Sequence, residues 1–599
     1  MKRLLFFITL FTMVLFTAPS LLLADTVDVA VLPPGNVNNV INGDTLAGGV
    51  RAHPDRVYRL QRGAVYQVTE RFLFNGSVNI VASSGTARPP VLAPAILADN
   101  SSIDHFFDLI GYASNVSISN VYITCFRADQ AQLGWSDGIR INADSVNLTL
   151  KGCIFDGFSH TAIQLNNWWA KMDVQDCTFR NEMHGTSWFG GGAFLSGAGP
   201  AMDTCKFINN TFYCNNSYLW SIRGYDKYSL FDHNTIVYGT VNPFLIRQGQ
   251  HIHINNNIFY AAHAMGGNPD HVINSWFLNY PDTASSSIVR FRGTDSVSYW
   301  YNLWGGAAAG AITGPEAYEN DARGVTANMV APTNRVIEVK NNDFFLPQKL
   351  LDFYTSYNDT VTAVDSIQVP VYGSANEIPV PLKRVLYKPT WMSDYTMWTL
   401  DTLLAGKATI NVANNIESDP GFNSDVQTQL DSLILYVWKI TTNHLDHPWF
   451  YNPNASFYPP AWPLPENLAY TSSSLQSGGS DGFAVGDLNW FPSQKAAWEQ
   501  GATAVNDAAV TPNKFSLSQN YPNPFNPTTT ITFNLAKSGY ATLSVYNVLG
   551  QKVATLVSGN LNAGSHQINF NASNLSSGVY FYRLESDNNT SIKKMMLLK

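Results

Sequence analysis

Asn210-Thr211-Phe212, Asn234-Thr235-Ile236 and Asn257-Ile258-Phe259 are the stretches that decide the fold of this 599-residue chain. Each triplet begins with asparagine, continues into two residues that favour a strand, and follows the previous triplet after 24 or 23 residues. A short repeat of strand-like pairs and turn residues is typical of a solenoid, in which each repeat forms one coil. The three triplets therefore predict consecutive coils of a parallel β-solenoid.

A small polar residue before an apolar pair can be traced in both directions from these triplets. The predicted column is Asn120, Cys153, Cys177, Asn210, Asn234, Asn257, Asn302 and Asn342. Its successive spacings are 33, 24, 33, 24, 23, 45 and 40 residues, so the longer ones indicate one coil plus an insertion. One more coil is indicated at Asn411-Val412-Ala413-Asn414-Asn415-Ile416. The spacing argues against a propeller, and the absence of the Leu-x-x-Leu-x-Leu pattern excludes a leucine-rich solenoid.

Residues at equivalent positions of stacked coils lie about 4.8 Å apart. We therefore expect the asparagine side chains to form a ladder in which each amide bonds the next. Cys153 and Cys177 occupy the same column in consecutive coils. Two buried, stacked thiols are the simpler interpretation of this pair, and a disulfide is the alternative. Five cysteines in 599 residues are too few for a disulfide scaffold.

The composition indicates a folded protein that does not bind nucleic acid. Charged residues and aromatic residues each make up 13% of the chain, which suits a large core. The net charge is −8, and no basic block of the kind that neutralises phosphates is present. Residues 1–24 show a basic start followed by a long apolar run, which predicts a secretory signal peptide. An uncleaved membrane anchor is the alternative, and we expect no membrane span in the mature protein.

The order of these segments predicts five regions. They are a signal peptide (1–24), a start or cap of the solenoid (25–110), the solenoid with insertions (111–425), a Trp- and Pro-rich wrapping segment with a linker (426–512) and a C-terminal domain (513–599). Residues 25–110 show no sustained helical periodicity and favour short strands. The run Leu430 to Trp438 predicts one short helix. We expect the protein to be a monomer.

The C-terminal domain carries the most specific motifs of the chain. They are Asn520-Tyr521-Pro522-Asn523-Pro524-Phe525-Asn526-Pro527, Val545-Tyr546-Asn547-Val548-Leu549-Gly550-Gln551-Lys552-Val553, Ser577-Gly578-Val579-Tyr580-Phe581-Tyr582-Arg583-Leu584 and Lys593-Lys594-Met595-Met596-Leu597-Leu598-Lys599. Alternating strands with a Pro-rich entry predict a small β-sandwich. The motifs resemble the type A C-terminal sorting domain of the type IX secretion system; an unrelated immunoglobulin-like module is the alternative. The resemblance implies bacterial export through the periplasm and across the outer membrane, with the type IX machinery as partner and cleavage of the domain at or after that crossing.

The solenoid is similar to the right-handed parallel β-helix superfamily that includes pectate lyases. The similarity covers roughly residues 30–495 and includes Asp419-Pro420-Gly421-Phe422 and the closing Asp481-Gly482-Phe483-Ala484-Val485-Gly486-Asp487-Leu488-Asn489-Trp490. It implies an all-β chain, with a right-handed parallel β-helix followed by the small β-sandwich. The superfamily includes lyases, hydrolases, esterases, epimerases and proteins with no known activity, so the fold leaves the function open.

A second column, about ten to thirteen residues before the first, contains arginines. It consists of Gly138-Ile139-Arg140, Ala162-Ile163-Gln164, Ser221-Ile222-Arg223, Leu245-Ile246-Arg247 and Arg290-Phe291-Arg292. If Ile222 and Ile246 point inward, Arg223 and Arg247 project outward from one sheet. Arg140 and Arg292 would extend this row. A row of guanidinium groups suits the carboxylates of an acidic polysaccharide; pairing of each arginine with a local acid such as Asp137 or Asp226 is the alternative.

Aromatic residues near this row are candidates for stacking on sugar rings. They are Trp135, Trp168, Trp169, Trp188, Trp220 and Tyr225, of which Trp220 and Tyr225 are the ones that we place in the substrate site. The alternative for each is a place in the packing of the solenoid.

Catalytic residues cannot be assigned from spacing. Calcium-assisted lyase chemistry needs converging carboxylates, and Asp137, Asp203, Asp226 and Asp232 share no column. His160 and Lys227 are possible bases, and a glycoside hydrolase would need two carboxylates at a set separation. His251 and His253 share a strand face, which is weak evidence for zinc. Two functions follow: binding, with or without cleavage, of an acidic polysaccharide, or a non-catalytic cell-surface or adhesion solenoid.

Overall fold

The computed structural model consists of two units that are described separately. It describes residues 25–598 except 48, 184–191, 197–199, 217, 267–288, 292–331, 361–364, 371–376, 383–385, 387, 393–399, 401–405, 407, 442–448, 454–455, 506–514, 518–519, 521–522, 524, 536, 538, 549, 562–563 and 587–588. The first unit ends at Pro492 and the second begins at Ser493. The proposed signal peptide (1–24), Asn302, Trp188 and Arg292 lie outside the described residues.

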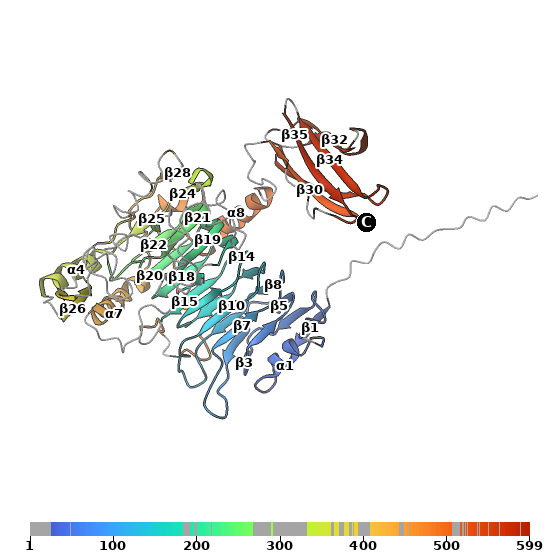
Figure 1. The fold of residues 1–599 in the computed structure, drawn as a ribbon. Helices are drawn as coiled ribbons and strands as arrows, with labels where there is room; N and C mark the ends of the chain where they lie inside the picture. Colours follow the sequence, from blue (N-terminus) through green and yellow to red (C-terminus); the bar gives the residue numbers. More distant parts are fainter. Residues whose placement is uncertain are drawn as a thin grey trace, which may run out of the picture. The chain divides into compact units, whose positions relative to one another are not determined.

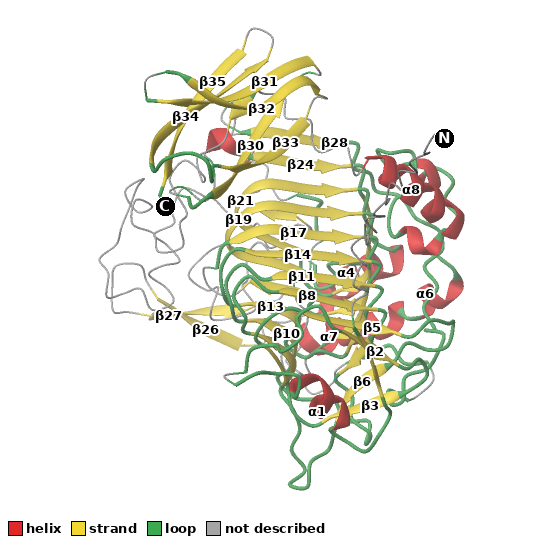
Figure 2. Cartoon of the chain, turned by 90° about the vertical axis from the view of Figure 1, so that its right-hand side faces the viewer, coloured by secondary structure: helices red, strands yellow, loops and turns green. Residues whose placement is uncertain are grey.

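The first unit is a solenoid whose coils contribute strands to three parallel ladders (Figures 1 and 2). The first ladder contains β1 (Thr26–Val29), β2 (Val57–Leu60), β5 (Val78–Ala82), β8 (Asn115–Ser119), β11 (Asn147–Lys151), β14 (Ala170–Gln175), β17 (Met202–Ile208), β19 (Trp220–Asp232), β21 (Phe244–Asn255), β24 (Val336–Lys340) and β28 (Thr409–Ala413). The second ladder contains β4 (Phe72–Phe74), β7 (His105–Leu109), β10 (Asp137–Ile141), β13 (Thr161–Leu165), β16 (Phe194–Ser196), the beginnings of β19 and β21, and β23 (Val289–Phe291).

The third ladder closes the coil. It contains β3 (Val65–Val68), β6 (Val91–Pro94), β9 (Tyr122–Thr124), β12 (Ile154–Asp156), β15 (Thr178–Glu182), β18 (Thr211–Asn215), β20 (Thr235–Gly239), β22 (Ile258–Tyr260) and β25 (Asp343–Phe345). Side chains alternate between the inside and the outside of the coil. The rings of Phe155, Phe179 and Phe212 occupy one inward column, and neighbouring ring centroids are 5.1 Å apart. All three rings are buried, so this column is part of the core.

The predicted asparagine ladder is present at the turn before the third ladder. Asn210, Asn234, Asn257, Asn342 and Asn415 bond in sequence, each Nδ2 donating to Oδ1 of the next asparagine at 2.8–3.0 Å. The same Oδ1 atoms accept the backbone N–H of the preceding asparagine. The coil expected at 411–416 is confirmed because Asn415 completes the row. Asn257 bonds Asn342 directly, although the predicted column placed Asn302 between them.

The prediction for Asn120 was wrong by one residue. Tyr122 pairs with Ile154, so Val121 and not Asn120 lies in register with Cys153. Asn120 belongs instead to a neighbouring column in which every backbone has a positive φ angle of 51–62°. That column is Asn120, Gly152, Asp176, Asn209, His233, Asn256, Asn341 and Asn414. Its residue types follow from the left-handed conformation, which glycine and asparagine tolerate best.

The five cysteines are buried and carry no disulfide. Cys153 and Cys177 lie in consecutive coils, as expected from their column, and are two stacked thiols. Cys153 Sγ donates to the carbonyl of Ile118 at 3.2 Å, so the thiol is satisfied by backbone.

Helices and short elements surround the coils. They are α1 (Asn36–Asn42), α4 (Gln348–Thr360), α6 (Ser424–Thr428), α7 (Leu430–Thr441), the 3-10 turns η4 (Pro332–Asn334), η6 (Leu475–Ser477) and η7 (Leu488–Trp490), and the hairpin of β26 (Asp365–Pro370) and β27 (Glu377–Leu382). The helix expected at Leu430 to Trp438 is confirmed as the main part of α7. Helix α1 was not expected, because only Val37 and Ile41 mark its apolar face.

The outer face of the third ladder is covered by the chain that follows the coils. Tyr458 and Leu464 pack on Val91, Tyr122 and Ile154, which point out of the coil. Further along, segment 478–490 runs across several turns, where Asp487 accepts from Thr211 Oγ1 at 2.7 Å and Trp490 Nε1 donates to the same hydroxyl at 2.9 Å. We call this the closing segment. A functional surface therefore has to be sought on the other two ladders.

The second unit is a β-sandwich, as predicted. After α8 (Pro492–Val505), one antiparallel sheet contains β29 (Ser516–Leu517), β30 (Thr528–Leu535) and β33 (Gly564–Asn571). The other contains, in order, β32 (Lys552–Leu561), β31 (Gly539–Asn547), β34 (Gly578–Ser586) and β35 (Asn589–Leu597). Ile531 and Phe533 from the first sheet and Leu543, Tyr582 and Leu584 from the second belong to one core.

Candidate functional site

A cluster of charged side chains lies at the N-terminal ends of three neighbouring strands of the second ladder. The strands are β7, β10 and β13, and their register pairs His105 with Asp137 and Asp137 with Thr161. This register places Asp104, the residue before β7, two coils away from His160, the residue before β13, with the start of β10 between them. Residues that are more than 50 positions apart in sequence thus lie along one edge.

Asp137 is the centre of this cluster. Its side chain is buried, and its Oδ1 lies 2.5 Å from Nδ1 of His160. Its other oxygen, Oδ2, accepts from Nε of Arg140 at 2.7 Å. The imidazole and the guanidinium are therefore both fixed by one buried carboxylate.

An exposed tryptophan stacks on the histidine of this pair. The rings of Trp135 and His160 are 4.1 Å apart at an interplanar angle of 27°. The Trp135 side chain is 51% exposed, although large aromatic rings are usually mostly buried. The histidine, itself held by Asp137, supports a ring that presents a flat apolar surface to solvent.

The polar cluster continues along β7. Arg140 Nη1 lies 3.1 Å from Oδ2 of Asp104, and Asp104 Oδ1 lies 2.8 Å from Nδ1 of the buried His105. Asp108, on the same strand, lies 3.7 Å from the guanidinium of Arg71. Three carboxylates are thus interleaved with two arginines.

A row of hydrogen-bonded amides leaves this cluster along the solenoid axis. Asn142 Nδ2 donates to Asp108 Oδ1 at 2.6 Å, and Asn166 Nδ2 donates to Asn142 Oδ1 at 2.7 Å. Asn166 is exposed and Asn142 is half-buried, so this face offers planar donors and acceptors to solvent over three coils.

The charges of the cluster stabilise one another. Burial alone would raise the pKa of Asp104, but the neighbouring His105 and Arg140 outweigh it and lower that pKa. Burial likewise opposes the ionisation of Asp108, and bonds from His105 and Asn142 together with the Arg71 charge lower its pKa overall. Burial disfavours the charged form of Arg140, yet its bonds to Asp137 and Asp104 raise its pKa. Asp104, Asp108 and Arg140 are therefore ionised at neutral pH.

The predicted arginine row is wrong for Arg140, and for Arg223, Arg247 and Arg292 it stays a prediction. Ile222 pairs with Ile246 and Ile246 with Phe291, so Arg223, Arg247 and Arg292 each follow a residue of one register column. The side chains of Arg223 and Arg247 lie outside the described part of the structure. Arg140 does not belong to the row, because it lies in register with Gln164, Leu195 and Ser221, two residues earlier.

The two aromatic residues placed in the substrate site are buried. Trp220 is 0% exposed, its ring packs on Phe231 and Phe244, and its Nε1 donates to Cys205 Sγ at 3.3 Å. Tyr225 is 1% exposed and donates to Gln250 Oε1 at 2.5 Å. Neither ring is available to a sugar, so these two assignments were wrong. The reason is register: Trp220 pairs with Phe194 and Phe244 in an inward column.

The other predicted candidates do not converge. Lys227 pairs with Asp203 at 3.1 Å, and His253 lies 3.7 Å from Glu338, separate from the Asp137 cluster. Asp226 is buried, and burial raises its pKa to about 7. Among the residues that the structure describes, no group of three or more His, Cys, Asp or Glu could hold a metal ion.

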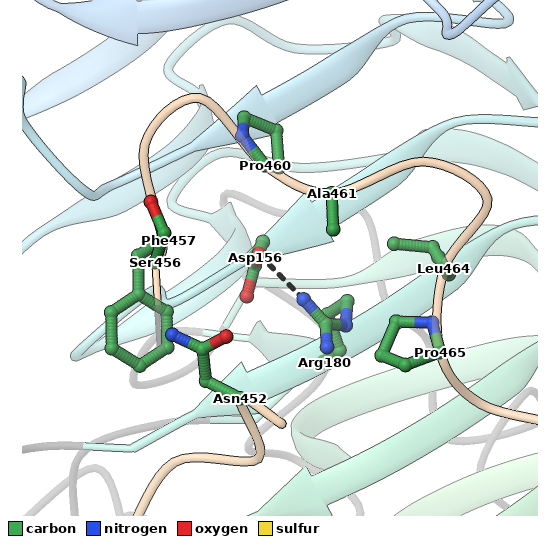
Figure 3. A pocket seen from close by; sticks show the side chains of 9 residues that line it. All are labelled: Asp156, Arg180, Asn452, Ser456, Phe457, Pro460, Ala461, Leu464 and Pro465. Atoms are coloured by element: carbon green, nitrogen blue, oxygen red, sulfur yellow. Dashed lines mark hydrogen bonds and ion pairs between the residues drawn. The ribbon is translucent and has the colours of Figure 1, made fainter. Parts of the chain in front are cut away.

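A second charged cluster lies under the covering chain of the third ladder. Arg180, which is buried, donates from Nη1 to Asp156 Oδ2 at 2.9 Å and from Nε to Glu466 Oε1 at 2.6 Å. Figure 3 shows Asp156 and Arg180 facing each other beneath Pro460 and Ala461. We call residues 449–453 and 456–466 the strap. This cluster fixes the strap to the coils, so it is structural.

Four residues of this cluster were candidates from the sequence: Trp135, Asp137, Arg140 and His160. Only the pairing of Arg140 with Asp137 was expected, as the alternative to a ligand-binding arginine, and the structure confirms it. Sequence reasoning missed Asp104, His105 and Asp108, because residues 25–110 were interpreted as a start or cap. One signal was present: Asp104 lies 32 residues before Ser136, close to the 33-residue spacing found elsewhere in the chain.

Two parts of the chain match known families. Residues 519–598 match the family described as the secretion system C-terminal sorting domain, and residues 137–268 match the right handed beta helix region. A comparison with curated proteins gave no match. The first match confirms a type IX sorting domain and secretion to the cell surface or outside. The second, with the parallel ladders, confirms a right-handed parallel β-helix. None of the described helices is long and apolar enough to cross a membrane.

Proposed function

We propose that this protein, a β-helix delivered to the cell surface or outside by the type IX system, binds a polysaccharide on the outer face of its second ladder. The observation that carries the proposal is the exposed Trp135 ring, stacked on a histidine that a buried aspartate fixes. A ring held in one orientation loses little conformational freedom when a ligand packs on it. A sugar presents an apolar face to such a ring and hydroxyl groups to the polar residues around it.

The shape of the polar surface supports an extended ligand. The bonded row of Asp108, Asn142 and Asn166 follows the solenoid axis from one coil to the next. Stacked coils generally create elongated binding surfaces. A linear glycan that lies along the axis would place one residue against Trp135 and others over the amide row.

The acidic character of the polysaccharide is a separate part of the proposal and depends on Arg223 and Arg247. The residues before them, Ile222 and Ile246, pair on adjacent coils, roughly 5 Å apart along the ladder, and the register shifts between Ile222 and Tyr225. Two cations at that spacing repel each other, and a polyuronate would relieve the repulsion. Binding of such a polymer would weaken with added salt.

Cleavage would use His160. Nδ1 of this histidine is occupied by Asp137, which leaves Nε2 as the nitrogen that can exchange a proton with a ligand. An aspartate that orients a histidine in this way is a common arrangement for a general base. Removal of the C5 proton of a uronate by Nε2, with loss of the C4 oxygen substituent, would give an unsaturated product.

A non-catalytic adhesion solenoid is the second candidate, and specific observations favour it. Arg140 is bound by Asp137 and Asp104, which makes it structural, and Trp220 and Tyr225 belong to the core. Because these three residues have structural roles, fewer of the residues predicted for the substrate site remain to bind a polysaccharide.

A binding panel with matched variants tests the proposal. The full chain is titrated with polygalacturonate, alginate and a neutral glucan. Trp135→Ala should weaken binding of each polymer that binds by at least tenfold. Trp462→Ala, which changes another exposed tryptophan, on the strap, should not change the binding. Arg223→Ala with Arg247→Ala should weaken only the two polyuronates.

The panel also separates the two candidates. Ultraviolet absorbance of an unsaturated product, lost in His160→Ala, would establish cleavage. Binding that survives Trp135→Ala, or no binding to any polysaccharide, would favour the adhesion solenoid.

A further inference from the structure

The sorting domain differs in charge from the rest of the chain. Residues 513–599 contain seven Lys and Arg against two Asp and Glu, a net charge of +5. The preceding 512 residues contain 29 against 42, a net charge of −13. A basic domain attached to an acidic chain indicates a partner that only the domain meets.

Apolar side chains are exposed on one face of the four-stranded sheet in this domain. The inward face of that sheet packs in the sandwich core through Leu543, Tyr582 and Leu584. On the opposite face Ile592 is 56% exposed, and Phe581 is also exposed. Such residues on the solvent side of a sheet mark an interaction surface when they are contiguous.

The register shows that these residues are contiguous and interleaved with cations. Phe581 lies opposite Lys594 on β35 and opposite Tyr546 on β31, and Arg583 lies opposite Ile592. The guanidinium of Arg583 lies 5.0 Å from the centre of the Tyr546 ring, donates to its hydroxyl at 2.9 Å and has its Nε 3.3 Å from Oε1 of Glu585. We call these five residues the basic-apolar face.

We propose that the basic-apolar face docks on an acidic protein surface of the secretion machinery, with an apolar centre that receives Phe581 and Ile592. The positive charge argues for an acidic rim, and the exposed rings and aliphatic groups argue for an apolar centre. The inference does not depend on the polysaccharide proposal, because it concerns the second unit alone.

A competition experiment tests the docking in cells that export this protein. The full chain is overproduced beside a reporter that carries the same sorting domain, and export of the reporter is measured. Overproduced wild type should reduce reporter export at least threefold by occupying the machinery. Two variants are overproduced in place of the wild type: the double variant Phe581→Ser with Ile592→Ser, and the single variant Lys594→Glu. Each should leave reporter export within about 1.3-fold of its level without overproduction.

Two control variants match these changes. Val548→Ser removes an exposed apolar side chain after β31, and Lys537→Glu reverses an exposed charge between β30 and β31. Both should compete as well as the wild type. Thermal unfolding of each full-length variant reports whether the sandwich is intact, and Lys594→Glu provides the test if the serine pair does not fold.

Two results would overturn the proposal. One is competition by the folded face variants at the wild-type level. The other is sedimentation of the wild type, but not of the serine pair, with phosphatidylglycerol vesicles, which would identify a lipid surface as the partner.

Discussion

Asn234 donates a hydrogen bond of 3.0 Å from its Nδ2 to Oδ1 of Asn257, one coil further along the solenoid. The same oxygen accepts the backbone N–H of Asn234 at 2.8 Å. One buried amide therefore holds both the backbone and the side chain of its neighbour. Because the pattern repeats from Asn210 to Asn415, the ladder fixes the stacking of the coils in this part of the solenoid.

Asn234→Leu should destabilise the solenoid strongly. The change leaves the N–H of Asn210 and the carbonyl of Phe207 without their partner. Each buried group left unsatisfied costs about 1–3 kcal/mol, so we expect a loss of at least about 3 kcal/mol in chemical unfolding. Asn147→Leu, in an exposed amide pair with Asn115, should cost less than about 1 kcal/mol and is the control. Equal losses in the two variants would show that the ladder does not stabilise the stack.

Asp226→Asn should change how stability depends on pH. Burial raises the pKa of Asp226 from 3.8 to about 7. The native state then binds more protons than the unfolded state between these values, so stability falls as pH rises through that window. The loss by pH 8 is on the order of 4 kcal/mol.

The asparagine variant keeps an oxygen to accept from Ser229 and removes the titration. It should unfold at a higher temperature than the wild type at pH 8 and at a similar temperature at pH 4. Asp431→Asn, an exposed carboxylate, should behave like the wild type at both values. If the wild type is more stable than Asp226→Asn at pH 8, the folded protein stabilises the charged form of this carboxylate, which would contradict the prediction.

Arg180→Ala should release the strap. The change leaves Asp156 and Glu466 as buried carboxylates without their cation, which costs about 3–5 kcal/mol. The loss should be smaller at pH 5 than at pH 8, because burial already raises the pKa of Glu466 and protonation removes the unpaired charge. Thermal unfolding and the rate of proteolysis within the strap measure the effect. Lys388→Ala, which breaks an exposed pair with Glu417, should cost less than about 1 kcal/mol.

Removal of residues 514–599 should stop delivery of the protein to the outside without unfolding the β-helix. The sorting domain is lost, but the closing segment 478–490, which bonds to Thr211, Thr235 and Asn256, is retained. Cell fractionation and thermal unfolding measure the two effects. Truncated protein found outside at the wild-type level would show that the domain is not needed for export.

Most of the fold could be predicted from the sequence because its repeat is short and chemically strict. Asn210, Asn234 and Asn257 share one residue type, a spacing of 23–24 residues and one role. The arginine column has no such constraint. Its inward positions accept Phe, Trp or Ile, so the sequence does not show that Trp220, rather than Ile222, is in register with Phe194. The coil formed by β16 was missed for the same reason, which shifted Arg140 by two residues.

The candidate site could be predicted only in part. Trp135, Asp137, Arg140 and His160 have residue types that suggest chemistry, but their contacts arise from strand ends that the register brings together. The 32-residue spacing between Asp104 and Ser136 was too little to distinguish Asp104 or Asp108 from ordinary surface acids. From the sequence alone, Trp220 and Tyr225 are plausible ligand contacts, whereas the structure buries both in the core.

The most direct test of the central claim is a crystal structure of the full chain with a bound oligosaccharide chosen from the binding panel. We expect a sugar ring packed on Trp135 within about 4 Å, with the oligosaccharide extending over Asn142 and Asn166 along the solenoid axis. A ligand bound on the first ladder or at the strap, with Trp135 exposed as before, would contradict the account.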